Sequence, residues 1–153
     1  MANISRDHMI NIEKAVQLFQ EGFSCSQAML GTYGERYGLA RDLALKLGDA
    51  FGGGMGGLGR TCGAVTGALM VIGLAHGRTA ADDMESKRAT SHRVQELIAR
   101  FETQHGSSVC RTLIGCEIDT PEKVRVAREQ GIFDRVCVGL VRSAAEILEH
   151  VLE

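Results

Sequence analysis

The amino-acid sequence predicts an all-α fold, a compact bundle of about six to eight helices. Apolar residues recur at intervals of three and four along most of the chain, and runs of β-branched or aromatic residues are scarce. Pro121 is the only proline in 153 residues, so little interrupts helix formation. The chain is 44% hydrophobic and 24% charged, which is typical of a globular protein. At this length we expect a single domain over residues 1–153.

The first third of the chain predicts three helices. Residues 5–21 carry apolar side chains at helical spacing, and Gly22 is expected to end this helix. Ser24 can cap a second helix, which carries Cys25 in its first turn. Residues 39–51 alternate in part like a strand, but their alanine, leucine, lysine and arginine content favours a third helix.

A central helix is predicted over about residues 61–76, with Thr61 as its N-cap. This segment is apolar nearly all round, which is typical of a helix surrounded by other helices. Gly63 and Gly67 would let neighbouring helices come close to it. We therefore expect the other helices to pack around this segment.

The second half of the chain predicts four more helices. Residues 82–104 are amphipathic and form a long helix, and a short one should follow Ser107 or Ser108. Another should begin at Pro121, and the last should cover residues 133–152. The residues of the long helix that we expect to face inward are Met84, Val94, Leu97, Ile98 and Phe101.

Charge and hydropathy argue against two classes of partner. The formal net charge is −2 and no run of lysine or arginine occurs, so we expect neither nucleic acid nor an anionic membrane as a partner. The most apolar stretch, residues 64–75, is too short to span a bilayer. Residues 1–7 contain no basic segment followed by an apolar one, so we expect no signal peptide and a cytoplasmic location.

Four of the five cysteines lie in or near the first turn of a predicted helix, behind a residue that can cap it. Cys116 differs because it follows Gly115, where a helix should end. The odd number of cysteines and the expected reducing compartment argue against structural disulfides. A bundle would allow four helix starts to point their thiols at one spot, where helix dipoles stabilise negative charge. The four cysteines are Cys25, Cys62, Cys110 and Cys137.

A glycine-rich loop precedes Cys62, and its backbone amides are expected to face an anion or the sulfides of a cluster. The loop also fits Gly-x-Gly-x-x-Gly and nearly fits the P-loop pattern. Both motifs need a preceding strand and a parallel sheet, which this sequence does not predict, so nucleotide binding is disfavoured. The glycines that we expect at the site are Gly53, Gly54, Gly56, Gly57 and Gly59.

Local spacing does not decide the chemistry of the cysteines. The chain has no Cys-x-x-Cys pair, no paired-cysteine zinc module and no ferredoxin-like run. Three interpretations stay open: ligands of a metal centre, a redox-active dithiol, and small apolar residues that only pack within a helical interaction module. The five histidines lack the paired helical spacing of a metal site.

Several segments together resemble a family of redox-active proteins named for its C…GCAxxG…C…C signature. They are residues 22–28, 51–55 and 61–70 and the cysteines at 110 and 137, so the resemblance covers nearly the whole chain. The sequence departs from the signature at Cys62, where the glycine follows the cysteine instead of preceding it. Related segments occur in split-Soret cytochromes c. The resemblance implies redox-active cysteines and a link to electron transfer.

Our first hypothesis is therefore electron transfer through an iron–sulfur or other metal centre held by the four cysteines, with a redox partner protein. The alternative hypothesis is dithiol–disulfide chemistry, with Cys62 and Cys25 as the reactive thiols. A third is a helical interaction module with structural cysteines. Apolar helices and small residues are also compatible with a homodimer. The sequence names neither an electron donor nor a substrate.

Overall fold

The structure, a computed structural model, describes residues 5–153, and within this range it contains eight α-helices and no strand. The prediction of an all-α fold is confirmed. Residues 1–4 lie outside the described residues. The expected domain begins there, and the expectation of no signal peptide is based partly on these residues. The elements are α1 (Arg6–Gln20), α2 (Cys25–Tyr33), a 3-10 turn η1 (Gly34–Tyr37), α3 (Arg41–Asp49), α4 (Gly63–His76), α5 (Met84–His105), α6 (Cys110–Ile114), α7 (Pro121–Glu129), a π-helical turn η2 (Phe133–Cys137) and α8 (Val138–Leu152).

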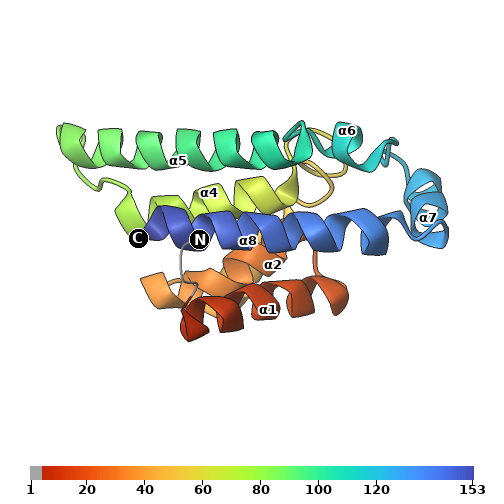
Figure 1. Ribbon diagram of the computed structural model, residues 1–153, viewed down its shortest axis with the longest axis horizontal. Coiled ribbons are helices and arrows are strands. Elements are labelled where there is room, and N and C mark those ends of the chain that lie inside the picture. The colour runs from red at the N-terminus through yellow and green to blue at the C-terminus, as the bar shows by residue number, and fades with distance from the viewer. Residues whose placement is uncertain (1–4) are drawn as a thin grey trace.

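The middle of the bundle is occupied by α4, as its apolar sequence predicts. Most of its residues from Gly63 to Ile72 are buried, and it packs against α2, α5 and α8. In Figure 1, α5 covers one side of α4, α1 and α2 lie on the other side, and α8 runs alongside. The helix begins at Gly63 and not at Thr61, so the expected N-cap is wrong: Cys62 takes that position, while Thr61 pairs with Val109 in an isolated β-bridge.

The close crossing of α2 and α4 depends on two glycines. A Cβ added at Gly67 would lie 2.7 Å from the Cβ of Met29 and 3.0 Å from the carbonyl oxygen of Ser26. A Cβ added at Gly63 would lie 3.0 Å from the backbone nitrogen of Ser26 and 3.2 Å from the Cβ of Cys25. Because no other residue has room there, the first turn of α4 lies directly against the first turn of α2.

Helix capping follows the sequence closely at two places. The Ser24 hydroxyl accepts from the Gln27 amide at 3.3 Å, and the Gln27 side chain accepts from the Ser24 amide at 3.0 Å, which completes a capping box at the start of α2. At α7, the Thr120 hydroxyl accepts from the Lys123 amide and Pro121 occupies the first turn. Both predicted helix starts are confirmed.

Two further expectations are wrong in detail. Met84 is 43% exposed, because it is the first residue of α5 and precedes the part of that helix whose buried face includes Leu97. The short helix α6 has Val109 as its N-cap without a side-chain cap, since the Ser107 hydroxyl accepts from the Val109 amide and the Ser108 hydroxyl donates to Glu102.

Buried apolar side chains form two clusters. The main core is formed by buried residues of α1, α2, α4, α5 and α8 together with Ala44 and Cys62. The small core lies beside it and contains six buried residues: Cys110, Ile114, Ile118, Ala127, Ile132 and Cys137. Within residues 5–153, no helix combines the length and the apolar character that crossing a membrane requires.

Candidate functional site

The four cysteines that the sequence singles out line one cavity of about 510 Å³. They come from the first turn of α2, the N-cap of α4, the first turn of α6 and the last residue of η2. Figure 1 shows these element boundaries gathered at one end of the bundle, next to α6 and α7. Cys116 does not line this cavity. The four residues are Cys25, Cys62, Cys110 and Cys137.

The cavity lies where the two cores meet. Cys62 belongs to the main core, whereas Cys110 and Cys137 belong to the small core. Cys25 is partly buried and packs against both. All five cysteines carry free thiols. Any group bound between the four sulfurs would therefore bridge the two cores.

Backbone hydrogen bonds hold the cysteines of α4 and α6 next to each other. The Cys62 amide donates to the carbonyl of Ser108 at 2.8 Å, and the Cys110 amide donates to the carbonyl of Arg60 at 2.6 Å. These bonds flank the β-bridge between Thr61 and Val109. This pairing of residues distant in sequence has no short-range signal, which is why the sequence predicts each helix start but not their contact.

The thiols of Cys25 and Cys137 influence each other, and a hydrogen bond from Cys25 to the Cys137 thiolate is the largest cause of the pKa shift of both groups. The bond from Cys25 lowers the pKa of Cys137, because it stabilises the Cys137 thiolate. The same bond, followed by burial, raises the pKa of Cys25 well above its ordinary value. Cys137 is therefore the thiol of this pair that loses its proton first.

Burial dominates at the other two thiols. It raises the pKa of Cys62 to about 11, although the backbone amides of Ala64 and Val65 donate to the sulfur and act in the opposite direction. Burial also raises the pKa of Cys110 to about 12, with further contributions from the charges of neighbouring cysteines. Since a metal ion binds the thiolate form, metal binding would release these protons.

The glycine loop forms a left-handed turn beside the cysteines. Five consecutive residues, Gly53 to Gly57, have φ between 61° and 80°, a region that glycine enters without steric cost. The turn is closed by bonds from the Gly59 amide to the Gly53 carbonyl at 3.0 Å and from the Arg60 amide to the Gly54 carbonyl at 2.9 Å. A Cβ added at Gly54 would lie 2.7 Å from the Cβ of Cys110, so the loop packs directly on this cysteine.

The structure brings three of the five predicted glycines to the cavity and not the other two. Gly53, Gly54 and Gly57 line it, whereas Gly56 and Gly59 do not. The amides of Gly53 and Gly54 donate to no backbone or side-chain acceptor within residues 5–153. They therefore remain available to a bound group, as the sequence predicts for this loop.

Much of the cavity wall is apolar, and sequence reasoning did not identify it. Three aromatic residues of different segments, Phe19, Phe23 and Phe133, line the cavity together with several aliphatic side chains. Asp134 and Arg128 are the charged side chains contributed by its η2 and α7 side. No sequence pattern unites these residues, because each follows the local helix period and only the tertiary packing turns them to one place.

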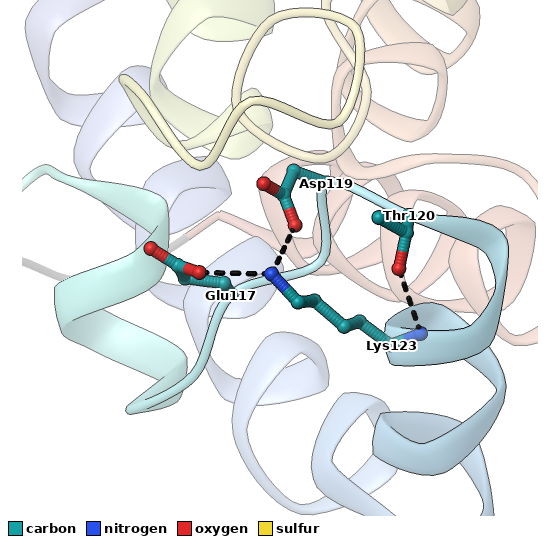
Figure 2. A network of polar contacts seen from close by, with 4 residues as sticks. All are labelled: Glu117, Asp119, Thr120 and Lys123. Atoms are coloured by element: carbon teal, nitrogen blue, oxygen red, sulfur yellow. Dashed lines mark hydrogen bonds and ion pairs between the residues drawn. The ribbon is translucent and has the colours of Figure 1, made fainter.

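A polar network positions the segment that leads into α7. Figure 2 shows the Lys123 side chain extending between two carboxylates, with its Nζ 3.0 Å from Glu117 and 2.7 Å from Asp119, while its backbone amide is capped by Thr120. In the sequence, Ile118 stands between Glu117 and Asp119. Its side chain lines the cavity and contacts the glycine loop. The network therefore holds one apolar part of the cavity wall in place.

The described residues contain no ready-made site for a single metal ion. A zinc-type site gathers its ligands at about 2.0–2.3 Å from one ion, and residues 5–153 contain no group of three or more His, Cys, Asp or Glu side chains arranged to hold a metal ion. The cavity nevertheless brings four soft sulfur donors and the unengaged amides of Gly53 and Gly54 to its wall, and these are groups that can hold a thiolate-ligated centre.

A family model described as "Putative redox-active protein (C_GCAxxG_C_C)" matches residues 23–151. The chain belongs to this family. The match covers α2 to α8 and includes every element that contributes a cysteine to the cavity. This confirms the resemblance found in the sequence and supports a redox-active protein. No curated protein and no solved structure matches the chain.

Proposed function

We propose that Cys25, Cys62, Cys110 and Cys137 hold an iron–sulfur cluster and that the protein transfers single electrons. The observation that carries this proposal is the convergence of four thiols, from four separate segments, on one cavity. The family's description as redox-active supports it. When bound, such a cluster accepts and releases one electron at a time.

The chain's own residues would set the properties of this centre. Amide donors aimed at sulfur raise the reduction potential of a cluster, and the backbone amides of Ala64 and Val65 at the start of α4 act in this sense, since they work to lower the pKa of Cys62. The unengaged amides of Gly53 and Gly54 lie on the same cavity. The phenylalanines and aliphatic residues that line the cavity would shield part of a bound group from water.

Anaerobic purification tests the proposal. We expect iron and acid-labile sulfide in the purified protein, visible absorption bands, and an electron paramagnetic resonance signal in one oxidation state. Replacing any of the four cysteines by serine should remove or shift these signals. Cys116→Ser is the matched control and should leave them unchanged, because Cys116 lies outside the cavity.

A colourless, iron-free protein, both after anaerobic purification and after reconstitution with iron and sulfide, would contradict the proposal. If in addition Cys62→Ser and Cys137→Ser changed only stability, the interpretation as a helical interaction module would stand. Binding of iron that is retained in all four serine variants would also contradict the assignment of ligands.

A second candidate function is dithiol–disulfide exchange, which the shared cavity and the opposite pKa shifts of Cys25 and Cys137 favour. In this case the Cys137 thiolate attacks a substrate disulfide and releases one substrate thiolate. Cys25 then attacks the mixed disulfide, which frees the second substrate thiol and leaves a Cys25–Cys137 disulfide. The substrate gains two electrons and two protons. These pKa shifts thus favour Cys25 with Cys137, rather than the sequence-based pair of Cys62 and Cys25.

Disulfide mapping after oxidation of the iron-free protein tests this second function. We expect oxidised glutathione to produce a Cys25–Cys137 linkage, and alkylation of the reduced protein to modify Cys137 before Cys62. Random pairing, or uniformly slow alkylation of all five cysteines, would contradict it. Both functions start from reduced thiols, so we propose a cytoplasmic location and a redox partner protein. Sedimentation analysis would test for a homodimer.

A further inference from the structure

The glycine loop contains one residue, Met55, whose backbone conformation is unfavourable for a residue with a side chain. Met55 has φ 66° and is the only non-glycine residue with positive φ within residues 5–153. A residue with a side chain is strained in this region, whereas glycine would fit without cost. The strain is not compensated by burial, because the Met55 side chain is 40% exposed. A strained residue that points an apolar side chain to solvent suggests a use for that side chain.

Met55 lies on a thin cover between solvent and the cysteine cavity. Its neighbours Gly54 and Gly57 line the cavity, and Gly54 packs on Cys110. Leu58, in the same loop, is 59% exposed. The loop thus has a cavity face almost without side chains and an outer face with two large apolar ones. A molecule seated on the outer face would lie next to the loop backbone that packs on Cys110.

Two exposed arginines border this outer face. Arg60 follows the loop directly, and the aliphatic part of Arg111 packs on Gly59, with a Cβ added there only 3.0 Å from that of Arg111. Neither guanidinium has an ion-pair partner within residues 5–153. On the other border, Lys123 is already engaged by Glu117 and Asp119 (Figure 2).

We propose that the surface made of Met55, Leu58, Arg60 and Arg111 docks a protein one-electron donor that presents an acidic face. Charge complementarity selects the partner: two uncompensated cations beside two apolar side chains suit carboxylates around an apolar centre. Within a chain of net charge −2, this local cationic patch also orients the encounter. The inference rests on the proposed electron-transfer function.

The proposed step transfers one electron and no atoms. The donor protein is oxidised by one electron and the cysteine-held centre is reduced by one electron, while no covalent bond forms or breaks. The glycine turn would shorten the path, because its backbone at Gly54 packs directly on Cys110. Electrostatic steering should make this encounter faster at low ionic strength than at high.

Two measurements with a small acidic ferredoxin as the probe test the proposal. Heteronuclear NMR with the oxidised ferredoxin reports docking without any electron transfer, and we expect shifts at residues 53–60 and at residue 111 that fade as salt is added. Stopped-flow mixing with the reduced ferredoxin reports electron transfer, with dithionite as a reductant that needs no docking surface.

Variants locate the surface. Two surface variants are used: Met55→Gly, and the double variant Arg60→Glu/Arg111→Glu. Met55→Gly relieves the positive-φ strain, so it should fold normally. Each variant should lower the affinity for ferredoxin and the rate of reduction by ferredoxin, and we expect a fall of about tenfold or more when both are combined. Arg88→Glu is the matched control, since Arg88 is exposed in the first turns of α5, at the opposite end of the molecule in Figure 1. Reduction by dithionite should be unchanged in all variants.

The outcomes separate the two ideas. The docking surface would be overturned if wild type and both surface variants bound ferredoxin equally, or if the NMR shifts were confined to other faces. This holds even if dithionite reduces the protein. Failure of dithionite to reduce the wild type, with the NMR shifts present and lost in the variants, would overturn the electron-transfer function and leave the docking surface supported.

Discussion

The two cores of this protein differ in depth, and the cysteine cavity lies between them. The main core draws on five helices and contains side chains without any exposure, such as Ile72, Leu97 and Phe101. The small core has six members, and most of them retain a few per cent of exposure. A cluster with few contacts opens locally at lower free energy than a deep one. The wall formed by α6, α7 and η2 is therefore the part of the site that can adjust.

This difference separates the cysteines by role. Cys62 is fixed at the start of α4 inside the main core, whereas Cys110 and Cys137 belong to the part that yields more easily. A bound cluster or a new disulfide would require sulfurs to shift, and the small core supplies that movement without disturbing the α2–α4 crossing. Binding would in turn stabilise mainly the small core.

The largest expected effect on stability comes from truncating one buried isoleucine in each core. Ile72→Ala should lower the free energy of unfolding by about 3–4 kcal/mol, because Ile72 is fully buried in the main core. Ile114→Ala, in the small core, should cost only about 2 kcal/mol but should speed the alkylation of Cys110 more than Ile72→Ala does. Chemical denaturation and thiol labelling check both. Equal losses of stability would remove the distinction between the cores.

A smaller effect should follow from adding one methyl group to α4. Gly67→Ala places a Cβ 2.7 Å from Met29 and should destabilise the protein by about 2 kcal/mol, since α2 and α4 must move apart. Gly73→Ala in the same helix is the control. Nothing lies within 4 Å of a Cβ at Gly73, so alanine should stabilise the helix by about 0.5–1 kcal/mol. Thermal unfolding distinguishes the two, and a loss of stability at both positions would disprove the packing argument.

The main core should also weaken at alkaline pH through Tyr33. Burial, and then the nearby charge of Glu149, raises the pKa of this phenol well above its ordinary value of 10.0. The unfolded chain therefore loses the phenolic proton first, so the contribution of Tyr33 is complete below about pH 10 and is lost as pH rises above it. We expect roughly 1.4 kcal/mol per pH unit above 10. Tyr33→Phe should show a smaller loss over the same range, and identical pH profiles would contradict this account.

The smallest effect is expected at the edge of the small core. Lys123→Gln removes the cation between Glu117 and Asp119, and both ion pairs are exposed, so the melting temperature should scarcely change. Hydrogen exchange of residues 116–120 should become faster, because Ile118 loses its support. Added salt should reproduce the effect in the wild type. Unchanged exchange in the variant would show that the network does not position this segment.

Local chemistry made the helices predictable. Ser24 and Gln27 form their capping box from side chains three residues apart, and Thr120 with Pro121 starts α7 in the same local manner. Prediction was poorer at Thr61 and Met84, where the chain beyond the helix decides the outcome. Thr61 joins a bridge to Val109 instead of capping α4, and Met84 lies at a helix start that no neighbour covers.

The candidate site was predictable in its members but not in its pairing. The four cysteines could be named because each follows a helix-start signal, and the glycine loop because of its composition. The hydrogen bond from Cys25 to Cys137 joins residues at opposite ends of the chain, and no local pattern encodes such a contact. The same holds for the apolar wall around Phe19 and Phe133.

The sequence by itself determined the helices, the caps at Ser24 and Thr120, the buried character of α4 and the four cysteines of the candidate site, because these depend on interactions within a few residues. Only the tertiary structure decided that four helix starts meet at the seam of two cores, which thiols touch, and which three glycines reach them. These outcomes depend on how closely helices approach, and at Gly63 and Gly67 that distance is set by backbone and side-chain atoms of another helix, α2.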